Sequence, residues 1–330
     1  MAILVTGGAG YIGSQMVHDL VDAGERVVVL DNLSTGHRRA IPEGVPLIVG
    51  ESGNQALVTR LLREHSVATI IHFAASIVVP DSVRDPLDYY RNNTANSRAL
   101  IECAVACGVR HFIFSSTAAI YGNPVAIPVP EDAPTQPISP YGWSKLMTEI
   151  MLRDTSRAHD LAHVILRYFN VAGGDPRGRT GQSTANATHL IKVAVEAALG
   201  RREKLAVFGT DYPTPDGTCI RDYIHVSDLT RAHSDALRHL RSGGASLTLN
   251  CGYGHGSSVL EVVDTVTRVS GVVFKVEYAH RREGDPARIV AGSERIRAML
   301  GWQPNFDDLS TIVAHALNWE RELSVRRKAI

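Results

Sequence analysis

The first half of the chain alternates short apolar runs with longer amphipathic segments. The apolar runs are rich in Val, Ile and Phe and end at turn residues, which is typical of β-strands. They cover residues 2–5, 26–30, 46–49, 69–73, 110–114 and 163–167. The segments between them have the apolar spacing of helices, and they cover residues 11–23, 54–64, 87–107 and 141–158.

The predicted strands are continuously apolar, and helices alternate with them along the chain. Such strands belong to parallel sheets that are covered by helices on both faces. The pattern therefore predicts an α/β fold built on a doubly wound parallel sheet. With 330 residues the chain exceeds one minimal core, so we expect one large domain or two lobes.

Composition excludes several classes of protein. Lys and Arg total 34, as do Asp and Glu, so no basic excess indicates a nucleic-acid or membrane-surface partner. No apolar run approaches the ~18 residues of a membrane span, and residues 1–5 are too short for a secretory signal. The cysteines do not have a zinc or redox spacing; they are Cys103, Cys107, Cys219 and Cys251. We expect a cytoplasmic protein without a bound metal.

The first strand–helix junction carries a glycine triplet, Gly7, Gly10 and Gly13. Glycines at such a junction permit a tight turn and let backbone amides approach a pyrophosphate at the helix N-terminus. Asp31 ends the second predicted strand, where a carboxylate would accept hydrogen bonds from an adenosine ribose. Because this carboxylate would repel a 2′-phosphate, the pattern favours NAD over NADP.

A tyrosine and a lysine, Tyr141 and Lys145, lie four residues apart where a helix is predicted to begin at Pro140. Residues at this spacing share one helix face and can serve one cleft. A free tyrosine titrates near pH ~10, and a neighbouring cation lowers that pKa enough for proton transfer near neutral pH. Taken alone, the pair is more often a solvated tyrosine beside a surface lysine.

Together these motifs resemble the extended short-chain dehydrogenases/reductases, and specifically the UDP-glucose 4-epimerase family, from Gly7 to about Trp302. The resemblance implies a Rossmann-type NAD-binding domain in residues 1–170, with returning segments at about 220–251. It also implies a smaller mixed α/β lobe, mainly residues 171–330, that binds a UDP-sugar. Members of the group usually form homodimers, so we expect a homodimer here.

The resemblance implies NAD as the cofactor. It assigns contacts with NAD to Gly7, Gly10, Tyr11, Ile12, Gly13, Asp31, Asn32, Ser34, Glu51, Ser52, Phe73, Ala74, Ala75, Asn92, Ser115, Tyr141, Lys145, Tyr168 and Phe169. Two positions depart from the family pattern. Glu51 lies about where the family usually has an aspartate that contacts the adenine. Ile77 lies where the family has a lysine that contacts the cofactor. The missing charge leaves the retention of the cofactor open.

Thr117 completes the family's catalytic set with Tyr141 and Lys145, because its hydroxyl can bridge the tyrosine and a substrate oxygen. The resemblance assigns substrate contacts to Thr117, Tyr141, Asn170, His189, Leu190, Ala206, Val207, Phe208, Arg221, Tyr223, Arg282 and Asp285. The two arginines would clamp the diphosphate, and Asp285 would bind the uridine ribose. His189 stands where better-known members have asparagine.

The implied reaction is the interconversion of UDP-glucose and UDP-galactose. Tyr141 would take the proton of the sugar 4-hydroxyl while C4 passes hydride to NAD; the 4-keto sugar would then rotate and be reduced on its other face. Related 4,6-dehydratases carry an Asp-Glu pair after the threonine, where this chain has Ala118 and Ala119. Dehydration is therefore not expected.

Two other functions stay open. The motifs specify UDP and the cofactor better than the sugar's C2 and C6 substituents, so the substrate could be UDP-glucuronate, a UDP-pentose or a UDP-N-acetylhexosamine. A cofactor-sensing regulator with the same fold is a further alternative, although such proteins typically lack the Tyr–Lys pair that this chain retains.

Overall fold

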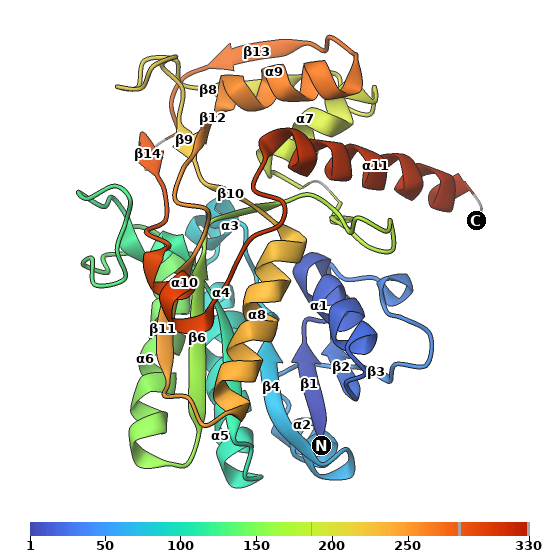
Figure 1. Cartoon of the computed structure of the whole chain (residues 1–330), viewed down its shortest axis with the longest axis vertical. Helices are drawn as coiled ribbons and strands as arrows, with labels where there is room; N and C mark the ends of the chain where they lie inside the picture. The colour runs from blue at the N-terminus through green and yellow to red at the C-terminus, as the bar shows by residue number, and fades with distance from the viewer. Residues whose placement is uncertain (186, 283–284, 329–330) are drawn as a thin grey trace.

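A seven-stranded parallel sheet forms the centre of the molecule (Figure 1), a computed structural model that describes residues 1–185, 187–282 and 285–328. Residues 283 and 284, between the predicted substrate residues Arg282 and Asp285, lie outside the described residues. The strand order is β11-β6-β5-β4-β1-β2-β3. The strands are β1 (Ala2–Thr6), β2 (Val27–Asp31), β3 (Leu47–Val49), β4 (Val67–His72), β5 (His111–Thr117), β6 (Ala162–Tyr168) and β11 (Leu247–Cys251).

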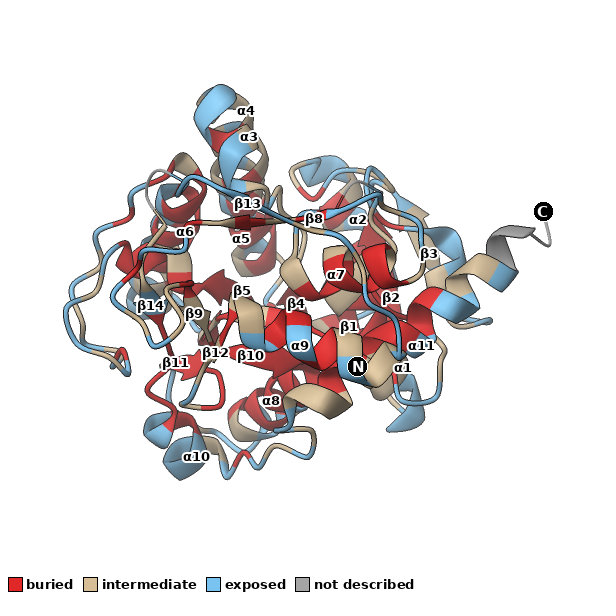
Figure 2. Cartoon of the chain, turned by 90° about the horizontal axis from the view of Figure 1, so that it is seen from above, coloured by how far each residue is buried: buried red, intermediate tan, exposed pale blue. Residues whose placement is uncertain are grey.

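Helices cover both faces of this sheet, as the apolar strands predicted. Alternate residues of β1 enter different cores: Ile3 and Val5 pack toward α1 (Tyr11–Asp22) and α8 (Val226–Arg241). Leu4 belongs to the core formed with the helices of the other face. Those helices are α2 (Gln55–Glu64), α5 (Asn96–Ala106) and α6 (Pro140–Ala158). Figure 2 shows the sheet as the buried centre of the fold.

The strand order reverses between β1 and β4, because β2 and β3 lie on one side of this pair and β5 and β6 on the other. In doubly wound sheets, ligands bind beside the carboxyl ends of the strands at such a point. All seven strands are parallel, so their carboxyl ends lie at one edge of the sheet. This edge is the expected place for the candidate site.

The helix predicted over residues 87–107 is helical from Pro86 to Ala106, but a π-helical turn interrupts its α-helical pattern. The structure contains α3 (Val79–Arg84), α4 (Pro86–Tyr89), a π-helical turn (Tyr90–Ala95) and α5. Two prolines, Pro80 and Pro86, lie in the first turns of α3 and α4 and favour separate helix starts. In the π-helical turn the buried side chain of Asn93 donates to the Ser76 carbonyl at 2.9 Å and to Ser144 Oγ at 3.0 Å.

The later half of the chain lies mostly beyond the carboxyl ends of the parallel strands (Figure 1). It contains three small sheets, in which β7 (Asn170–Ala172) pairs with β10 (Tyr223–His225), β8 (Leu205–Phe208) with β13 (Val276–Ala279), and β9 (Ile220–Arg221) with β12 (Ser257–Ser258) and β14 (Arg288–Ile289). Its helices besides α8 are α7 (Leu190–Ala198), α9 (Val259–Ser270), α10 (Glu294–Leu300) and α11 (Leu309–Lys328). The later segments α8 and β11 return to the central sheet.

Short 3₁₀ turns complete the fold at Arg38–Ala40 and Ala118–Tyr121. Across the described ranges, every helix is too short or too polar to span a bilayer. The same residues contain no group of three or more His, Cys, Asp or Glu that could hold a metal ion.

Candidate active site

The turn between β1 and α1 has no room for side chains at two of its glycines. A Cβ on Gly13 would lie 2.1 Å from the Gly7 carbonyl oxygen, and one on Gly7 would lie 2.6 Å from the Ala74 nitrogen. Gly7 also has a φ of +70°, which glycine adopts readily. The N-cap of α1 is Gly10, without a side-chain cap. Its first N–H groups can therefore bind an anion such as a pyrophosphate.

Asp31 lies buried at the end of β2, beside the glycine turn. Its Oδ2 accepts a hydrogen bond from Ala9 N at 2.9 Å, and its Oδ1 accepts one from Leu33 N at 2.8 Å. A carboxylate has about four acceptor positions, so Asp31 can also accept hydroxyl groups of a ribose. Asn32 and Glu51 meet at the same edge, where Asn32 Nδ2 donates to Glu51 Oε1 at 3.1 Å.

The segment after β4 borders the other side of the glycine turn. Phe73 and Ala74 donate their N–H groups to the Thr6 carbonyl at 2.9 and 3.1 Å. Asn92 Nδ2 donates to Ser76 Oγ at 2.8 Å, so the predicted cofactor residue lies beside this segment. Ile77 is exposed at the position that corresponds to the family's lysine. These residues fit a dinucleotide that lies across the switch point of the sheet.

Thr117, Tyr141 and Lys145 are all buried at the carboxyl edge of the sheet. Thr117 ends β5, and the other two lie in the first two turns of α6, whose N-cap Ser139 accepts from Gly142 N at 3.2 Å. Gly142 lets the helix approach closely, because a Cβ there would lie 2.7 Å from the Ala119 carbonyl oxygen. The helix thereby brings Tyr141 against Thr117.

The electrostatics of this pair differ from the expectation that Lys145 lowers the pKa of Tyr141. Burial raises the pKa of Tyr141 to about 12, although a hydrogen bond with Thr117 acts in the opposite direction. Burial also lowers the pKa of Lys145 to about 7, against the attraction of Glu149. The ammonium donates to the Ser115 carbonyl at 2.9 Å. In the protein alone, desolvation therefore outweighs the effect that the sequence suggested.

A histidine that the sequence analysis did not identify lies beneath this site. His233 Nδ1 donates to the Leu229 carbonyl at 2.9 Å, so its Nε2 accepts from the Ser115 hydroxyl at 3.0 Å. Burial lowers the pKa of His233 to about 4, which keeps the ring neutral. Tyr168 lies beside Ser115 and Tyr141, and burial raises its pKa. The spacing along the chain gave no indication that His233 would meet Ser115.

A buried ion pair supports the catalytic helix from within. Glu149 lies one helical turn beyond Lys145 in α6. Its Oε2 lies 2.7 Å from Arg167 Nη2, and the side chains of Glu149 and Arg167 are almost completely buried. Glu149 also accepts from the Ser116 hydroxyl at 2.5 Å. Arg167 donates to the hydroxyl of Tyr121 at 2.9 Å. This network joins β5, β6 and α6 below the predicted catalytic residues.

Four of the predicted substrate residues line one cavity. Asn170, His189, Leu190 and Tyr223 come from β7, the start of α7 and β10, and residues of α11 close the cavity. Gln182 also lines it, and its Nε2 donates to His189 Nδ1 at 2.7 Å. The structure therefore brings together residues that lie up to about fifty positions apart in the sequence.

The other predicted substrate residues form two separate contacts. Arg221 donates to the Pro286 carbonyl at 2.8 Å and lies 3.6 Å from Asp285. Arg282 places its guanidinium over the ring of Phe208, 3.8 Å from the ring centroid. In β8, Val207 is fully buried, whereas Ala206 and Phe208 remain partly exposed. The two arginines are therefore held by different partners, without a direct contact between them in the described structure.

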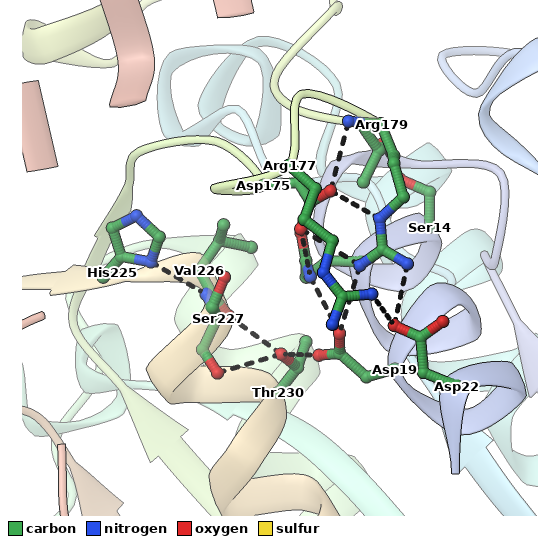
Figure 3. Close-up of polar contacts among 12 residues, drawn as sticks. Ser14, Asp19, Asp22, Asp175, Arg177, Arg179, His225, Val226, Ser227 and Thr230 are labelled. Atoms are coloured by element: carbon green, nitrogen blue, oxygen red, sulfur yellow. Dashed lines mark hydrogen bonds and ion pairs between the residues drawn. The ribbon is translucent and has the colours of Figure 1, made fainter. Parts of the chain in front are cut away.

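Ion pairs join the segment after β7 to α1, as Figure 3 shows. Arg177 and Arg179 each donate to Asp22 Oδ2 at 2.8 Å, and the Thr230 hydroxyl of α8 donates to Asp19 at 2.6 Å. The hydroxyl of Tyr11, the first residue of α1, donates to the Gly173 carbonyl at 2.7 Å. These contacts couple the glycine turn to the segment that leads into the substrate cavity.

Comparisons with known proteins agree with this geometry. Residues 3–252 match the model of the NAD dependent epimerase/dehydratase family. Over 321 residues the chain is 62% identical to a UDP-glucose 4-epimerase of Azospirillum brasilense, covering 97% of this chain and 92% of that protein.

Two solved structures have the same fold. One is a UDP-glucose 4-epimerase from Brucella ovis in complex with NAD, with a TM-score of 0.93 and 42% identity over 96% of this chain and 97% of that one. The other is the UDP-Glc/GlcNAc 4-epimerase of Campylobacter jejuni, with a TM-score of 0.85 and 47% identity over 97% of this chain and 99% of that one.

Proposed function

Because this chain belongs to the NAD dependent epimerase/dehydratase family, we propose that it is an NAD-dependent UDP-glucose 4-epimerase. It interconverts UDP-glucose and UDP-galactose by inverting C4 of the sugar. The observation that carries this proposal is the burial of Thr117, Tyr141 and Lys145 side by side at the carboxyl edge of the sheet. The glycine turn that fits a dinucleotide opens at the same edge.

The residues of the glycine turn, Asp31 and Asn92 fit NAD and would hold it across the switch point. When bound, NAD supplies the hydride acceptor for C4 of the sugar and the donor that reduces the 4-keto sugar. The uncapped N-terminus of α1 receives the pyrophosphate. Asp31 receives the ribose hydroxyls, and Lys145 holds the ribose next to the nicotinamide.

Tyr141 acts as the base that removes the proton of the sugar 4-hydroxyl, and Thr117 bridges the two oxygens. Since burial raises the pKa of Tyr141 to about 12, phenolate at neutral pH requires about 7 kcal/mol of preferential stabilisation. In a dry cleft, the Lys145 ammonium and the positive nicotinamide ring can provide stabilisation of this size. Tyr141 then returns the proton when the 4-keto sugar is reduced.

The UDP moiety carries the binding energy, so that the sugar can turn between the two hydride transfers. Arg221, Arg282 and Asn170 bind the diphosphate, and Asp285 binds the uridine ribose. Guanidinium groups suit this role because their planar donors match phosphate oxygens. Few strong contacts to the sugar ring are needed, and too many would prevent its rotation.

The proposed lobes follow from these roles. Residues 1–170, with returning segments at about 220–251, form the NAD-binding domain, and residues 171–330 mainly bind the UDP-sugar. We also place the enzyme in the cytoplasm, because all four cysteines are free thiols, as is usual in a reducing compartment.

A homodimer is the proposed assembly. Trp143, Met147 and Ile150 form an exposed apolar stripe along α6, and Val83 and Leu87 are exposed on the neighbouring short helices. A contiguous apolar surface of this kind is typical of an interface. Sedimentation should give twice the mass of one chain, and Trp143→Glu should reduce it to one. A monomeric wild-type protein would refute this assembly.

The decisive experiment uses the enzyme as purified. Acid denaturation should release NAD, and incubation with UDP-galactose without added cofactor should produce UDP-glucose until equilibrium is reached. Equilibration without cofactor is expected because the hydride leaves and returns within one turnover. Absence of any conversion with a full complement of NAD would overturn the proposed function.

A second candidate is a 4-epimerase that also accepts a UDP-N-acetylhexosamine. The observation that favours it is the 47% identity to the protein described as a UDP-Glc/GlcNAc 4-epimerase. UDP-glucuronate and UDP-pentoses remain further substrates to compare. The ratio of kcat/KM between UDP-galactose and each of these sugars decides among them.

A further inference from the structure

A chain of buried contacts leads from the C-terminal helix to the substrate cavity. Glu320 of α11 and Lys192 of α7 form an ion pair, and both side chains are almost completely buried. Lys192 Nζ donates to the Gln182 carbonyl at 3.0 Å. Trp319, next to Glu320, donates to the same carbonyl at 3.3 Å. Two residues from different helices therefore hold the backbone at Gln182.

The side chain of Gln182 in turn determines which ring nitrogen of His189 carries the proton. Its amide Nε2 has only hydrogens to donate, so His189 Nδ1 accepts at 2.7 Å. The proton of the neutral ring must then reside on Nε2, and burial lowers the pKa of His189 and opposes a second proton. His189 lines the cavity beside Asn170 and Tyr223. It can offer one N–H donor there.

Ion pairs around Lys192 also hold the segment just before His189. Lys192 lies 3.3 Å from Glu196, and Arg202, which also pairs with Glu196, donates to the Ala187 carbonyl at 2.8 Å. Arg201 pairs with the other oxygen of Glu320. These ion pairs join α7 and α11 at the wall of the cavity, which Lys192 and Glu320 also line. Their common effect is to hold both ends of the segment from Gln182 to His189.

We propose that Lys192 and Glu320 are positioning residues of the substrate site, which act through Gln182 to present His189 as a neutral Nε2–H donor to an oxygen of UDP. This inference rests on the proposed function for the identity of the ligand. His189, which the family resemblance placed among the substrate contacts, thereby has a defined role as a hydrogen-bond donor to UDP. Residues of the C-terminal helix that line the cavity thereby contribute to nucleotide affinity.

Calorimetric titration of the purified holoenzyme with UDP tests the proposal. His189→Ala and Gln182→Leu should each raise the Kd of UDP about five- to tenfold, the effect of one lost hydrogen bond. The double variant should bind no more weakly than His189→Ala, because both changes remove the same contact. The KM for UDP-galactose should rise in parallel, while kcat stays within twofold.

Lys192→Met and the double variant Lys192→Met/Glu320→Gln should weaken UDP binding by a similar factor. Arg268→Met is the matched control, because Arg268 contacts Ser310 at the other end of α11 and lies away from the cavity contacts. It should leave the Kd of UDP unchanged. Lys192→Arg should restore part of the affinity.

Nitrogen NMR of labelled histidine gives a readout that a merely structural role would not move. In the wild type, His189 should show the neutral Nε2–H tautomer between about pH 6 and pH 8. Gln182→Glu should convert it to the Nδ1–H or doubly protonated form and weaken UDP binding. Wild-type tautomer and affinity in Gln182→Glu and Gln182→Leu would overturn the inference.

Failure of the inference and failure of the proposed function give different results. If the wild type interconverts the UDP-sugars and all variants bind UDP as the wild type does, the inference alone fails. If the wild type shows no turnover but the variants weaken UDP binding as described, the proposed reaction fails and the positioning role stands.

Discussion

In the cofactor lobe, Thr117, Tyr141 and Lys145 lie on a strand and a helix of the seven-stranded sheet, whereas Arg221, Arg282 and Asp285 lie on a two-residue strand and in loops. The first group rests on a core that extends across the whole sheet. The contacts of the second group include an ion pair between Arg221 and Asp285, hydrogen bonds from Arg221 to backbone carbonyls, and the Arg282 guanidinium over the Phe208 ring. The proposed chemistry therefore rests on the central sheet, and the proposed nucleotide contacts on short segments outside it.

The two regions also stabilise buried carboxylates differently. Glu149, on the helix that carries Tyr141 and Lys145, is paired with the Arg167 guanidinium. Asp222, next to Arg221, is fully buried and accepts N–H groups from Tyr253, Gly254 and Ala291. An ion pair keeps a carboxylate charged, whereas backbone donors offset its desolvation only in part. The surroundings of these two carboxylates should therefore respond differently to mutation and to pH.

The largest effect is expected from Tyr141→Phe, which removes the proposed base from the region that rests on the central sheet. The kcat for UDP-galactose should fall about 10³- to 10⁴-fold, equivalent to about 4–5 kcal/mol in the barrier. The Kd of UDP and the content of NAD should stay unchanged, since the phenol contributes to chemistry. A kcat within tenfold of the wild type would assign the base elsewhere.

Glu149→Gln should damage stability rather than binding. The change leaves the Arg167 guanidinium buried without its carboxylate and should lower the free energy of unfolding by about 3–5 kcal/mol. Chemical denaturation measures this loss. The double variant Glu149→Met/Arg167→Met should lose less, because both charges are absent; a greater loss would show that the hydrogen bonds of Arg167 matter more than its charge.

Asp222 should make the stability of the protein sensitive to pH. Burial raises its pKa to about 6, although three backbone N–H groups act in the opposite direction. Between about pH 4 and pH 6 the folded state binds more protons than the unfolded state, so stability falls as the pH rises. The decrease from this group should be about 3 kcal/mol. This decrease in stability is complete above about pH 6 and absent below about pH 4.

Comparison of the wild type with Asp222→Asn isolates this contribution. Other carboxyl groups titrate equally in both proteins, so the difference between their unfolding free energies should change by that amount across the window. The free energy of unfolding of the wild type should fall relative to that of Asp222→Asn as the pH rises from about 4 to about 6. A difference that is constant with pH would indicate that Asp222 titrates normally.

Arg221→Met should have the smallest of these effects, confined to nucleotide binding. Loss of its charged hydrogen bonds should raise the KM for UDP-galactose about 10- to 50-fold, or by about 2 kcal/mol, at nearly constant kcat. Arg288→Met is the control, because Arg288 is an exposed arginine on the neighbouring strand of the same small sheet. Equal KM values for both variants would remove Arg221 from the diphosphate site.

Much of the cofactor lobe could be predicted because its signals are local. The apolar runs predicted the six strands of the first half within a few residues, and the glycine triplet marked the turn whose crowding the structure explains. The π-helical turn inside the helix at 87–107 was not predicted, because Asn93 obtains its partners from Ser76 and Ser144, which periodicity does not include. The predicted site residues remain proposals until they are tested by mutation.

The sequence by itself determined the α/β class and the dinucleotide turn, because spacing and residue type encode these features along short stretches of chain, and its family resemblance proposed Thr117, Tyr141 and Lys145 as the catalytic set. Only the tertiary structure decided the electrostatic state of that set and the partners of His233, Gln182 and Lys192. Desolvation depends on everything that packs around a group. The contacts that define these partners join segments that no local pattern relates.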